Sequence, residues 1–315
     1  MKTAAIICAQ GIGDGLLMMI AAHQLKRNGY EVTLFHNEVK ELSSLFKGYR
    51  YLPYPSNSSL QEVLNPYSIV VIENDNSQRA WQLFALRNKG ILSNLVFFFP
   101  TKSKNQLKND FLFDSRSSMA TNIVNGCIYA LGLRNANKEN GLLIPETRHY
   151  RSFRDRIVIH PTSNDIKRNW LPSQYIKLCD WLKNEGFSIS FITGPKERKE
   201  WLFVEEKGIQ LPPFGSIKEV AEYIYESGFF IGNDSGIGHL ASNLSIPTLT
   251  ISGNPKRVRL WRPDWCIGKV VTIPFSLPNF KGINFRFREN YWQYFIPESR
   301  TINAFQDLIK VCNHL

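Results

Sequence analysis

An aspartate stands inside a glycine-rich turn near the start of the chain. The stretch IICAQGIGDGLLMM (residues 6–19) predicts a buried strand, a turn with Gly11, Gly13 and Gly15, and an apolar helix from about Leu16. Such a turn commonly binds phosphate through free backbone N–H groups, but the carboxylate of Asp14 would repel a phosphate. Asp14 is therefore either a helix N-cap or a general base at the carboxyl end of a parallel strand, where ligands of such sheets bind.

The turn does not match the dinucleotide-binding fingerprint. That fingerprint needs G-x-G-x-x-G, followed about 20 residues later by an acid that binds a ribose. Here Leu16 takes the place of the third glycine, and the second predicted strand ends in His36 and Asn37. We therefore interpret the glycines as allowing a tight turn that presents Asp14, and not as a nucleotide cradle.

Polar residues also follow two predicted strands in the second half of the chain. HPTSNDIKRNW (residues 160–170) supplies the hydroxyls of Thr162 and Ser163 and the cation of Lys167. That set suits a phosphate oxygen, although a surface lysine in a polar turn has the same pattern. The stretch TGPKE carries Glu197, which either binds both hydroxyls of a ribose or favours the first turn of a helix.

The most distinctive motif is NDSGIGHLASNLSIPTLTISG (residues 233–253). An apolar strand runs into Asp234, Ser235 and Gly236, and small residues open a helix. The free N–H groups of such a helix suit a diphosphate. His239, one turn into the helix, either adds a hydrogen bond to that ligand or is a buried core residue.

The surrounding pattern predicts two domains. At 315 residues the chain is about twice the usual domain size. The first part alternates β-rich and helical stretches, which is typical of βαβ units on a parallel sheet. Residues 101–118 are polar and poor in periodicity, which predicts a surface loop. Residues 134–156 have the composition of a linker, and the pattern restarts at Ile157. We expect an N-terminal domain over 1–152 and a C-terminal domain over 153–315.

Composition argues against several classes of protein. Five cysteines, none in a C-x-x-C pair, disfavour a disulfide framework and a zinc site. No apolar run approaches the roughly 18 residues of a membrane span, and Gln10 interrupts the N-terminal apolar run, so a cytoplasmic location is expected. The net charge of +11 favours an anionic partner. The sequence has no zinc-finger, RNP1-like or basic-helix signature, so nucleic acid is not the expected anionic partner.

Taken in order, GIGD, HPTSNDIKRNW, TGPKE and NDSGIGHLASNLSIPTLTISG resemble the heptosyltransferases of glycosyltransferase family 9, which build the inner core of lipopolysaccharide. The resemblance implies a GT-B fold, with two Rossmann-like α/β domains whose parallel sheets face a central cleft. The N-terminal domain would bind the acceptor. The C-terminal domain would bind a nucleotide diphosphate sugar, typically ADP-heptose.

The resemblance also implies roles for the residues of these motifs. Asp14 would deprotonate an acceptor hydroxyl, which then attacks the anomeric carbon with inversion. The implied donor-binding residues are Thr162, Ser163 and Lys167 at the leaving diphosphate, Glu197 at the ribose, and Asp234, Ser235, Gly236 and His239 at the sugar and diphosphate. No metal or cofactor is expected, because a lysine and a helix N-terminus can offset the developing negative charge.

The expected acceptor is a lipid-linked or phosphorylated saccharide, and the positive charge favours peripheral contact with an anionic inner membrane. Two departures concern this acceptor. Cys8, Ala9 and Gln10 stand where relatives often carry a basic residue, and the aromatic, basic stretch from Trp261 to Phe295 differs from the usual tail. These aromatic residues either pack in the core or form an acceptor-binding or membrane-facing surface.

Two alternatives to transfer stay open. One is a nucleotide-sugar epimerase or hydrolase, which would act on the donor without a glycan acceptor. The other is a non-catalytic homologue that binds a nucleotide sugar. The joint presence of Asp14, Lys167, Glu197 and His239 disfavours the second alternative.

Overall fold

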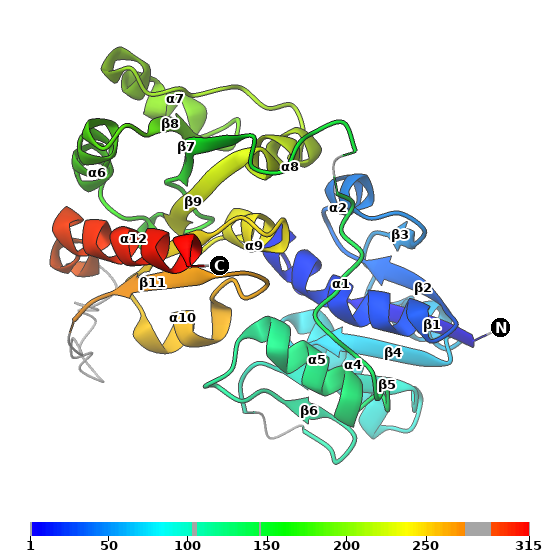
Figure 1. Cartoon of the computed structure of the whole chain (residues 1–315). Coiled ribbons are helices and arrows are strands. Elements are labelled where there is room, and N and C mark those ends of the chain that lie inside the picture. Colours follow the sequence, from blue (N-terminus) through cyan, green and yellow to red (C-terminus); the bar gives the residue numbers. More distant parts are fainter. Residues whose placement is uncertain (1, 103–105, 145, 275–290, 315) are drawn as a thin grey trace. The chain divides into compact units, whose positions relative to one another are not determined.

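The computed structural model describes residues 2–102, 106–144, 146–274 and 291–314. It divides by its internal contacts into two units, Met1–Leu143 and Ile144–Leu315. The predicted class is confirmed, because each unit is a parallel sheet with helices on its faces (Figure 1). The boundary expected from the sequence lies a few residues further along the chain, where the first strand of unit 2 begins at Phe153.

Unit 1 holds a six-stranded sheet in the order β3-β2-β1-β4-β5-β6. Its strands are β1 (Lys2–Ile7), β2 (Tyr30–Phe35), β3 (Arg50–Leu52), β4 (Ile69–Glu73), β5 (Leu95–Phe99) and β6 (Phe111–Leu112). Its helices are α1 (Ile12–Arg27), α2 (Val39–Leu45), α3 (Leu60–Leu64), α4 (Gln78–Asn88) and α5 (Met119–Tyr129). The chain runs to one side of β1 as far as β3 and then to the other side from β4 onward, so β1 and β4 flank a topological switch point.

The strand register of unit 1 brings three strand ends to one level. Ile7 of β1 pairs with Phe35 of β2 and with Ile72 of β4. The last residues of all three strands are buried, because helices cover both faces of the sheet. The loops that follow β1, β2 and β4 therefore leave the sheet side by side.

Unit 2 holds a five-stranded sheet in the order β11-β10-β9-β7-β8. Its strands are β7 (Phe153–His160), β8 (Ser188–Phe191), β9 (Ser227–Asn233), β10 (Thr248–Ser252) and β11 (Gly268–Thr272). Its helices are η1 (Ile166–Arg168), α6 (Pro172–Asn184), α7 (Arg198–Trp201), η2 (Leu202–Lys207), α8 (Ile217–Tyr225), α9 (Gly236–Asn243), α10 (Pro255–Trp261), η3 (Trp292–Phe295) and α12 (Glu298–Asn313). Here the switch point lies between β7 and β9.

The register of unit 2 also aligns its strand ends. His160 of β7 pairs with Gly232 of β9, and Ile251 of β10 pairs with Asn233. Large aromatic side chains fill the core between the sheet and helices α6 and α12, including the buried Trp170 and Phe305. The loops that carry the candidate donor residues therefore start from a rigid edge.

Several expectations from the sequence need correction. Helix α1 begins at Ile12 and not near Leu16, so Asp14 lies in the first turn of the helix. The N-cap is Gly11, and the alternative that Asp14 is the N-cap is wrong. A short strand, Phe111–Leu112, lies in a stretch predicted to be a loop, because it pairs with the end of β5.

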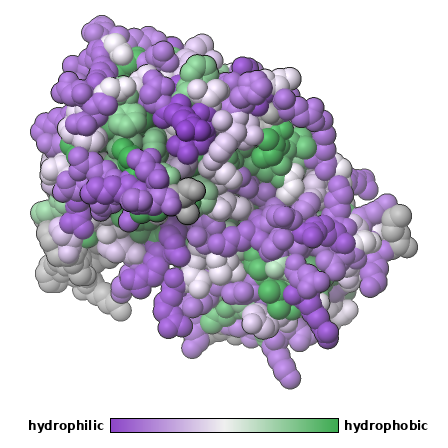
Figure 2. All heavy atoms as spheres, in the orientation of Figure 1, coloured by the Kyte–Doolittle hydropathy of each residue, from purple (hydrophilic) through white to green (hydrophobic). Residues whose placement is uncertain are grey.

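The aromatic tail contributes to the core. Trp292 is buried and Phe295 packs against the same hydrophobic cluster. Four other aromatic residues of that tail, Phe275, Phe280, Phe285 and Phe287, lie outside the described residues. In the part of the chain that the structure describes, no helix is long and apolar enough to cross a membrane. The face drawn in Figure 2 is mostly hydrophilic, with small separate apolar groups.

A buried ion pair ties the end of α4 to the loop before β6. Arg87 binds both carboxylate oxygens of Asp110, at 2.7 and 3.0 Å, and the same carboxylate accepts from the backbone N–H groups of Phe97 and Leu107. Neither charged side chain is more than 7% exposed. We predict that Asp110→Asn lowers the free energy of unfolding by about 3–5 kcal/mol in urea titrations, because Arg87 keeps its charge in a buried site.

The exposed pair of Arg27 and Glu139 is the control for this prediction, with side chains 46% and 66% exposed. Glu139→Gln should cost no more than about 1 kcal/mol. Equal losses in the two variants would contradict the structural role of the buried pair.

Candidate active site

The candidate donor residues of unit 2 follow three neighbouring strand ends. Thr162, Ser163 and Lys167 follow β7, and Asp234 and Ser235 follow β9. Glu197 follows β8. Because the carboxyl ends of parallel strands lie at one edge of the sheet, all six lie at the edge where ligands of such folds bind.

Lys167 and Asp234 line the same pocket. The pocket has a volume of about 180 Å³, and its lining residues are Asp165, Lys167, Arg168, Asp234, Ser252, Gly253, Asn254, Arg257 and Trp292. Three of these residues are cations and two are acids, so the lining is suited to an anionic group that also carries hydroxyls. The end of β10 and the residues after it, which were given no role from the sequence, supply Ser252, Gly253 and Asn254.

An ion pair crosses this pocket. Arg257, in α10, places its Nε 3.2 Å from Oδ2 of Asp234. The arginine side chain is 43% exposed, whereas that of Asp234 is 8% exposed. The carboxylate is therefore fixed while part of the guanidinium faces solvent and can bind a further acceptor.

The loop that carries Lys167 is held by the C-terminal segment. Trp292 donates from Nε1 to the Lys167 carbonyl at 2.8 Å, and Gln293 donates from Nε2 to the same oxygen at 3.1 Å. Asn233, at the end of β9, accepts from the Trp170 N–H and donates to the Pro161 carbonyl. Side-chain hydrogen bonds thus fix both ends of the loop while the Lys167 side chain is exposed.

Thr162 and Glu197 contact each other directly. The Thr162 hydroxyl donates to Oε2 of Glu197 at 2.9 Å, and the same oxygen accepts from the Gly194 N–H at 3.1 Å. Glu197 is also the N-cap residue of α7, without a side-chain capping bond. One of the two carboxylate oxygens is therefore committed within the protein.

His160, the last residue of β7, links two of the candidate residues. Its Nδ1 lies 3.2 Å from the Ser235 hydroxyl, and its Nε2 lies 3.5 Å from that of Thr162. Burial lowers the pKa of His160 to about 4, so the ring is neutral at physiological pH. Ser163 is separate from this group, since its hydroxyl donates to Asn169 and to the Asp165 carbonyl.

His239, in α9, is buried and does not line the pocket. It is 3% exposed, its ring lies edge-on to Trp265, and Nδ1 has no hydrogen-bond partner in the described chain. Burial lowers its pKa to about 4. This environment matches the core-residue alternative better than a direct ligand contact.

In unit 1, the glycine-rich turn has specific backbone requirements. Gly11 has a φ of +108°, which favours glycine. A Cβ at Gly15 would lie 2.8 Å from Leu42 of α2, so this glycine allows the helices to pack closely. Asp14 is partly buried between these two positions, in the first turn of α1, where the helix dipole favours an ionised carboxylate.

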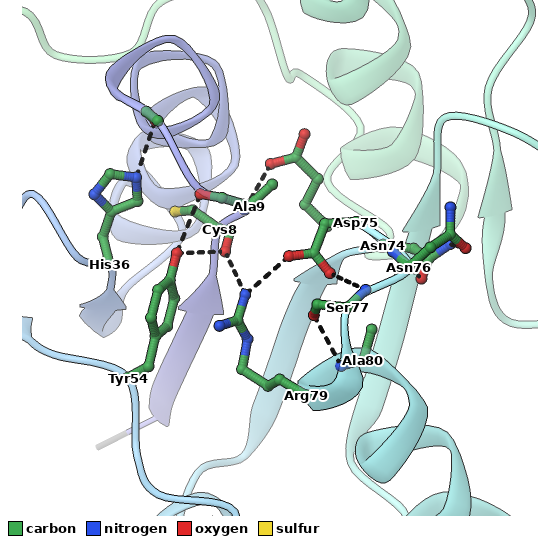
Figure 3. Close-up of polar contacts among 12 residues, drawn as sticks. Cys8, Ala9, His36, Tyr54, Asn74, Asp75, Asn76, Ser77, Arg79 and Ala80 are labelled. Carbon is green, nitrogen blue, oxygen red and sulfur yellow. Dashed lines mark hydrogen bonds and ion pairs between the residues drawn. The ribbon is translucent and has the colours of Figure 1, made fainter. Parts of the chain in front are cut away.

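Side chains from other segments of unit 1 bind the backbone of this turn (Figure 3). Tyr54 donates to the carbonyls of Cys8 and Ala9, at 3.0 and 3.1 Å. The guanidinium of Arg79 lies 3.7 Å from the centre of the Tyr54 ring and is paired with Asp75 at 3.0 Å. We refer to residues 8–15, with the backbone groups that these side chains bind, as the Asp14 loop.

His36 occupies the place where a dinucleotide site would have its ribose-binding acid. Its Nδ1 accepts from the Glu38 N–H at 2.9 Å, so the hydrogen on Nε2 donates to the Gly11 carbonyl at 3.0 Å. Burial lowers the pKa of His36, which favours this neutral form. The residue that breaks the fingerprint therefore supports the Asp14 loop.

The sequence matches a known protein family. The model of glycosyltransferase family 9 (heptosyltransferase) matches residues 91–270, which is more than half of the chain. The chain belongs to glycosyltransferase family 9. A curated relative, lipopolysaccharide heptosyltransferase 3 of Escherichia coli, is 27% identical over 115 residues. That match covers 34% of this chain and 33% of the relative, so the chain matches about a third of the length of that protein.

Solved structures support the family 9 fold over the whole chain. The E. coli ADP-heptose lipopolysaccharide heptosyltransferase II superposes with a TM-score of 0.68, covering 99% of this chain and 100% of that one, at 14% identity. The E. coli heptosyltransferase WaaC with ADP gives a TM-score of 0.65 and covers 97% and 99%, at 12% identity. The predicted GT-B fold is confirmed by these neighbours.

Within the described residues, no group of three or more His, Cys, Asp or Glu side chains could hold a metal ion.

The hydroxyl of Tyr54 provides a test of how the Asp14 loop is held. We predict that Tyr54→Phe costs about 1 kcal/mol of stability, from the lost hydrogen bonds, and speeds amide exchange in residues 9–15. Tyr51→Phe is the matched control, because the Tyr51 hydroxyl donates to the Phe46 carbonyl at 2.8 Å in the same unit. Equal exchange in the two variants, measured by mass spectrometry, would contradict the proposed support.

Proposed function

We propose that this chain is an inverting glycosyltransferase that moves heptose from ADP-heptose onto a lipopolysaccharide core or a related glycan. The main support is the pocket beside Lys167, in which cations from the loop after β7 and from α10 surround the edge of a parallel sheet. Membership of family 9 makes a sugar transfer the first expectation for such a pocket. Neighbours of this fold include the E. coli heptosyltransferase WaaC, in one structure with ADP and in another with ADP-2-deoxy-2-fluoro heptose.

The donor would bind unit 2 through its charged and polar groups. Lys167, Arg168 and Arg257 would offset the charge of the diphosphate, which grows on the leaving group as the glycosidic bond breaks. Ser235 and Gly236 would add backbone N–H groups at the start of α9. The free oxygen of Glu197 would accept from a ribose hydroxyl, while its other oxygen stays on Thr162.

The acceptor would be activated by Asp14. In this proposal its carboxylate takes the proton of an acceptor hydroxyl, and the oxygen attacks the anomeric carbon as the bond to the diphosphate breaks. Asp14 would act as an ionised carboxylate in the first turn of α1, where the helix dipole stabilises a negative charge. The acceptor would be a lipid-linked or phosphorylated saccharide at the inner face of a membrane, attracted by the net charge of +11.

The first test is Asp14→Asn, assayed with ADP-heptose and a deep-rough lipopolysaccharide acceptor. Loss of a general base should lower kcat by about 10²–10⁴ fold, while ADP affinity measured by calorimetry should stay within a few fold. Asp114→Asn, which changes an exposed acid of the same unit, is the control. Undiminished turnover in Asp14→Asn would contradict the assignment of the base.

The second test concerns the donor pocket. Lys167→Met and Arg257→Met should each weaken ADP binding by at least about tenfold, which corresponds to about 1.4 kcal/mol. Lys199→Met, at an exposed position of α7 outside the pocket, should leave the dissociation constant within about twofold. ADP affinity that is the same in all three variants would contradict the location of the donor site.

Product analysis with the donor alone separates transfer from the alternative reactions. A transferase consumes ADP-heptose rapidly only when the acceptor is present. Isomerised or hydrolysed sugar formed at the same rate without acceptor would instead indicate an epimerase or hydrolase. Binding without any conversion would indicate a non-catalytic homologue.

A further inference from the structure

A second carboxyl group lies beside the Asp14 loop. Glu73 ends β4, the strand that pairs with β1 across the switch point of unit 1. Its Oε2 accepts from the Ala9 N–H at 3.0 Å, and the residue is only 2% exposed. Glu73 therefore binds the loop that carries Asp14 from β4, the strand next to β1.

The other oxygen of Glu73 has no partner among the residues that the structure describes. Oε1 is buried and makes no hydrogen bond within the described residues. An ionised carboxylate with an unsatisfied buried oxygen is costly, because its charge has lost water without a replacement. A protonated carboxyl group is neutral, so it loses the cost of burying a charge, while Oε2 still accepts from the Ala9 N–H.

The charges around Glu73 also favour its neutral form. Burial first, and then the negative charge of Asp14, raise the pKa of Glu73 well above its usual range, with a smaller effect of Asp75 in the same direction. The Ala9 N–H acts in the opposite direction. The basic side chain nearby, Arg79, is paired with Asp75 and not with Glu73.

The remaining titratable groups come from the other elements around the loop. Cys8, directly after β1, is buried, and burial raises the pKa of its thiol. Tyr54 and His36 each bind backbone carbonyls of the loop. The tyrosine is a neutral phenol and the histidine a neutral ring at physiological pH, so neither supplies a positive charge to Glu73.

We propose that Glu73 is a positioning residue for Asp14: it holds the Asp14 loop with one oxygen and keeps a proton on the other, so that Asp14 carries the charge of the pair. This inference rests on the proposed function, in which Asp14 is the base. Two nearby carboxyl groups resist ionising together, and their different surroundings decide which one stays charged. Asp14 accepts the acceptor proton during transfer, and Glu73 retains its own proton throughout.

The first experiment measures the proton on Glu73 without any substrate. The folded form would keep a proton that the unfolded chain loses above its ordinary pKa of 4.5. The stability of the wild type should therefore fall as pH rises from about 4.5 toward the raised pKa, relative to Glu73→Gln, which has no such proton to lose. Each unit between the two pKa values corresponds to a tenfold change in the folding equilibrium constant.

Urea titrations between pH 5 and pH 8 would compare the wild type with Glu73→Gln and with Glu31→Gln, an exposed acid of the same unit. A midpoint difference between Glu73→Gln and the wild type that grows with pH, and is absent in Glu31→Gln, supports the proposal. Parallel curves for all three proteins would overturn it, because Glu73 would then be ionised in the folded state.

The second experiment separates positioning from catalysis. Glu73→Gln keeps an acceptor for Ala9 and should retain kcat within about threefold, far from the 10²–10⁴ fold loss expected for a missing base. Glu73→Ala removes the contact and should lower kcat about tenfold through a displaced loop, with ADP affinity unchanged. Loss of activity in Glu73→Gln as large as that in Asp14→Asn would overturn the proposal.

The two experiments distinguish a failure of the Glu73 assignment from a failure of the proposed function. If the chain is not a transferase, the wild type turns over no acceptor, yet the unfolding difference for Glu73→Gln persists. If the assignment of Glu73 is wrong, the wild type is active and the unfolding difference is absent.

Discussion

Parallel strands end at a common edge of their sheet, and this constraint determines where the chemistry of the chain lies. In unit 1 the switch point brings the ends of β1 and β4 together, and with them Asp14 and Glu73. In unit 2 it brings the ends of β7 and β9 together, and with them the Lys167 loop and Asp234. A residue several positions after any of these strands is placed with little freedom, because the register of buried strands is fixed.

The two edges differ in charge, and that difference gives each unit a chemical character. The edge of unit 2 has cations in and around a pocket, with Asp234 tied to Arg257. The edge of unit 1 has the carboxyl groups of Asp14 and Glu73 and a neutral histidine, and the guanidinium of Arg79 is paired with a further carboxylate, Asp75. The edge of unit 2 suits an anionic leaving group, and the edge of unit 1 suits removal of a proton. Each edge is preorganised by side chains that bind the backbone of its loop, which limits reorganisation during a reaction.

Much of this arrangement could be predicted from the sequence, because it depends on local patterns. Alternating buried strands and helices predicted both sheets, and strand exits such as TGPKE and NDSG predicted which residues lie at their edges. The supporting residues could not be found in this way. His160, His36 and Trp292 act through contacts with segments distant in the sequence, and a single histidine or tryptophan carries no periodic signal. Glu73 could be recognised as an acid at the end of an apolar strand. Its contact with the Asp14 loop could not be predicted, because that contact depends on β4 lying beside β1. The start of α1 at Ile12 could not be predicted either, because Gly13 and Gly15 disfavour a helix and so indicate a turn there.

The proposed function divides the roles between the two units: unit 2 would bind the nucleotide and unit 1 the acceptor. Hydrogen exchange of the whole chain with and without ADP tests that division most directly. With this division of roles, ADP should slow exchange in the loops after β7, β9 and β10 and leave exchange in the Asp14 loop unchanged. Protection of residues 9–15, with none in unit 2, would contradict it.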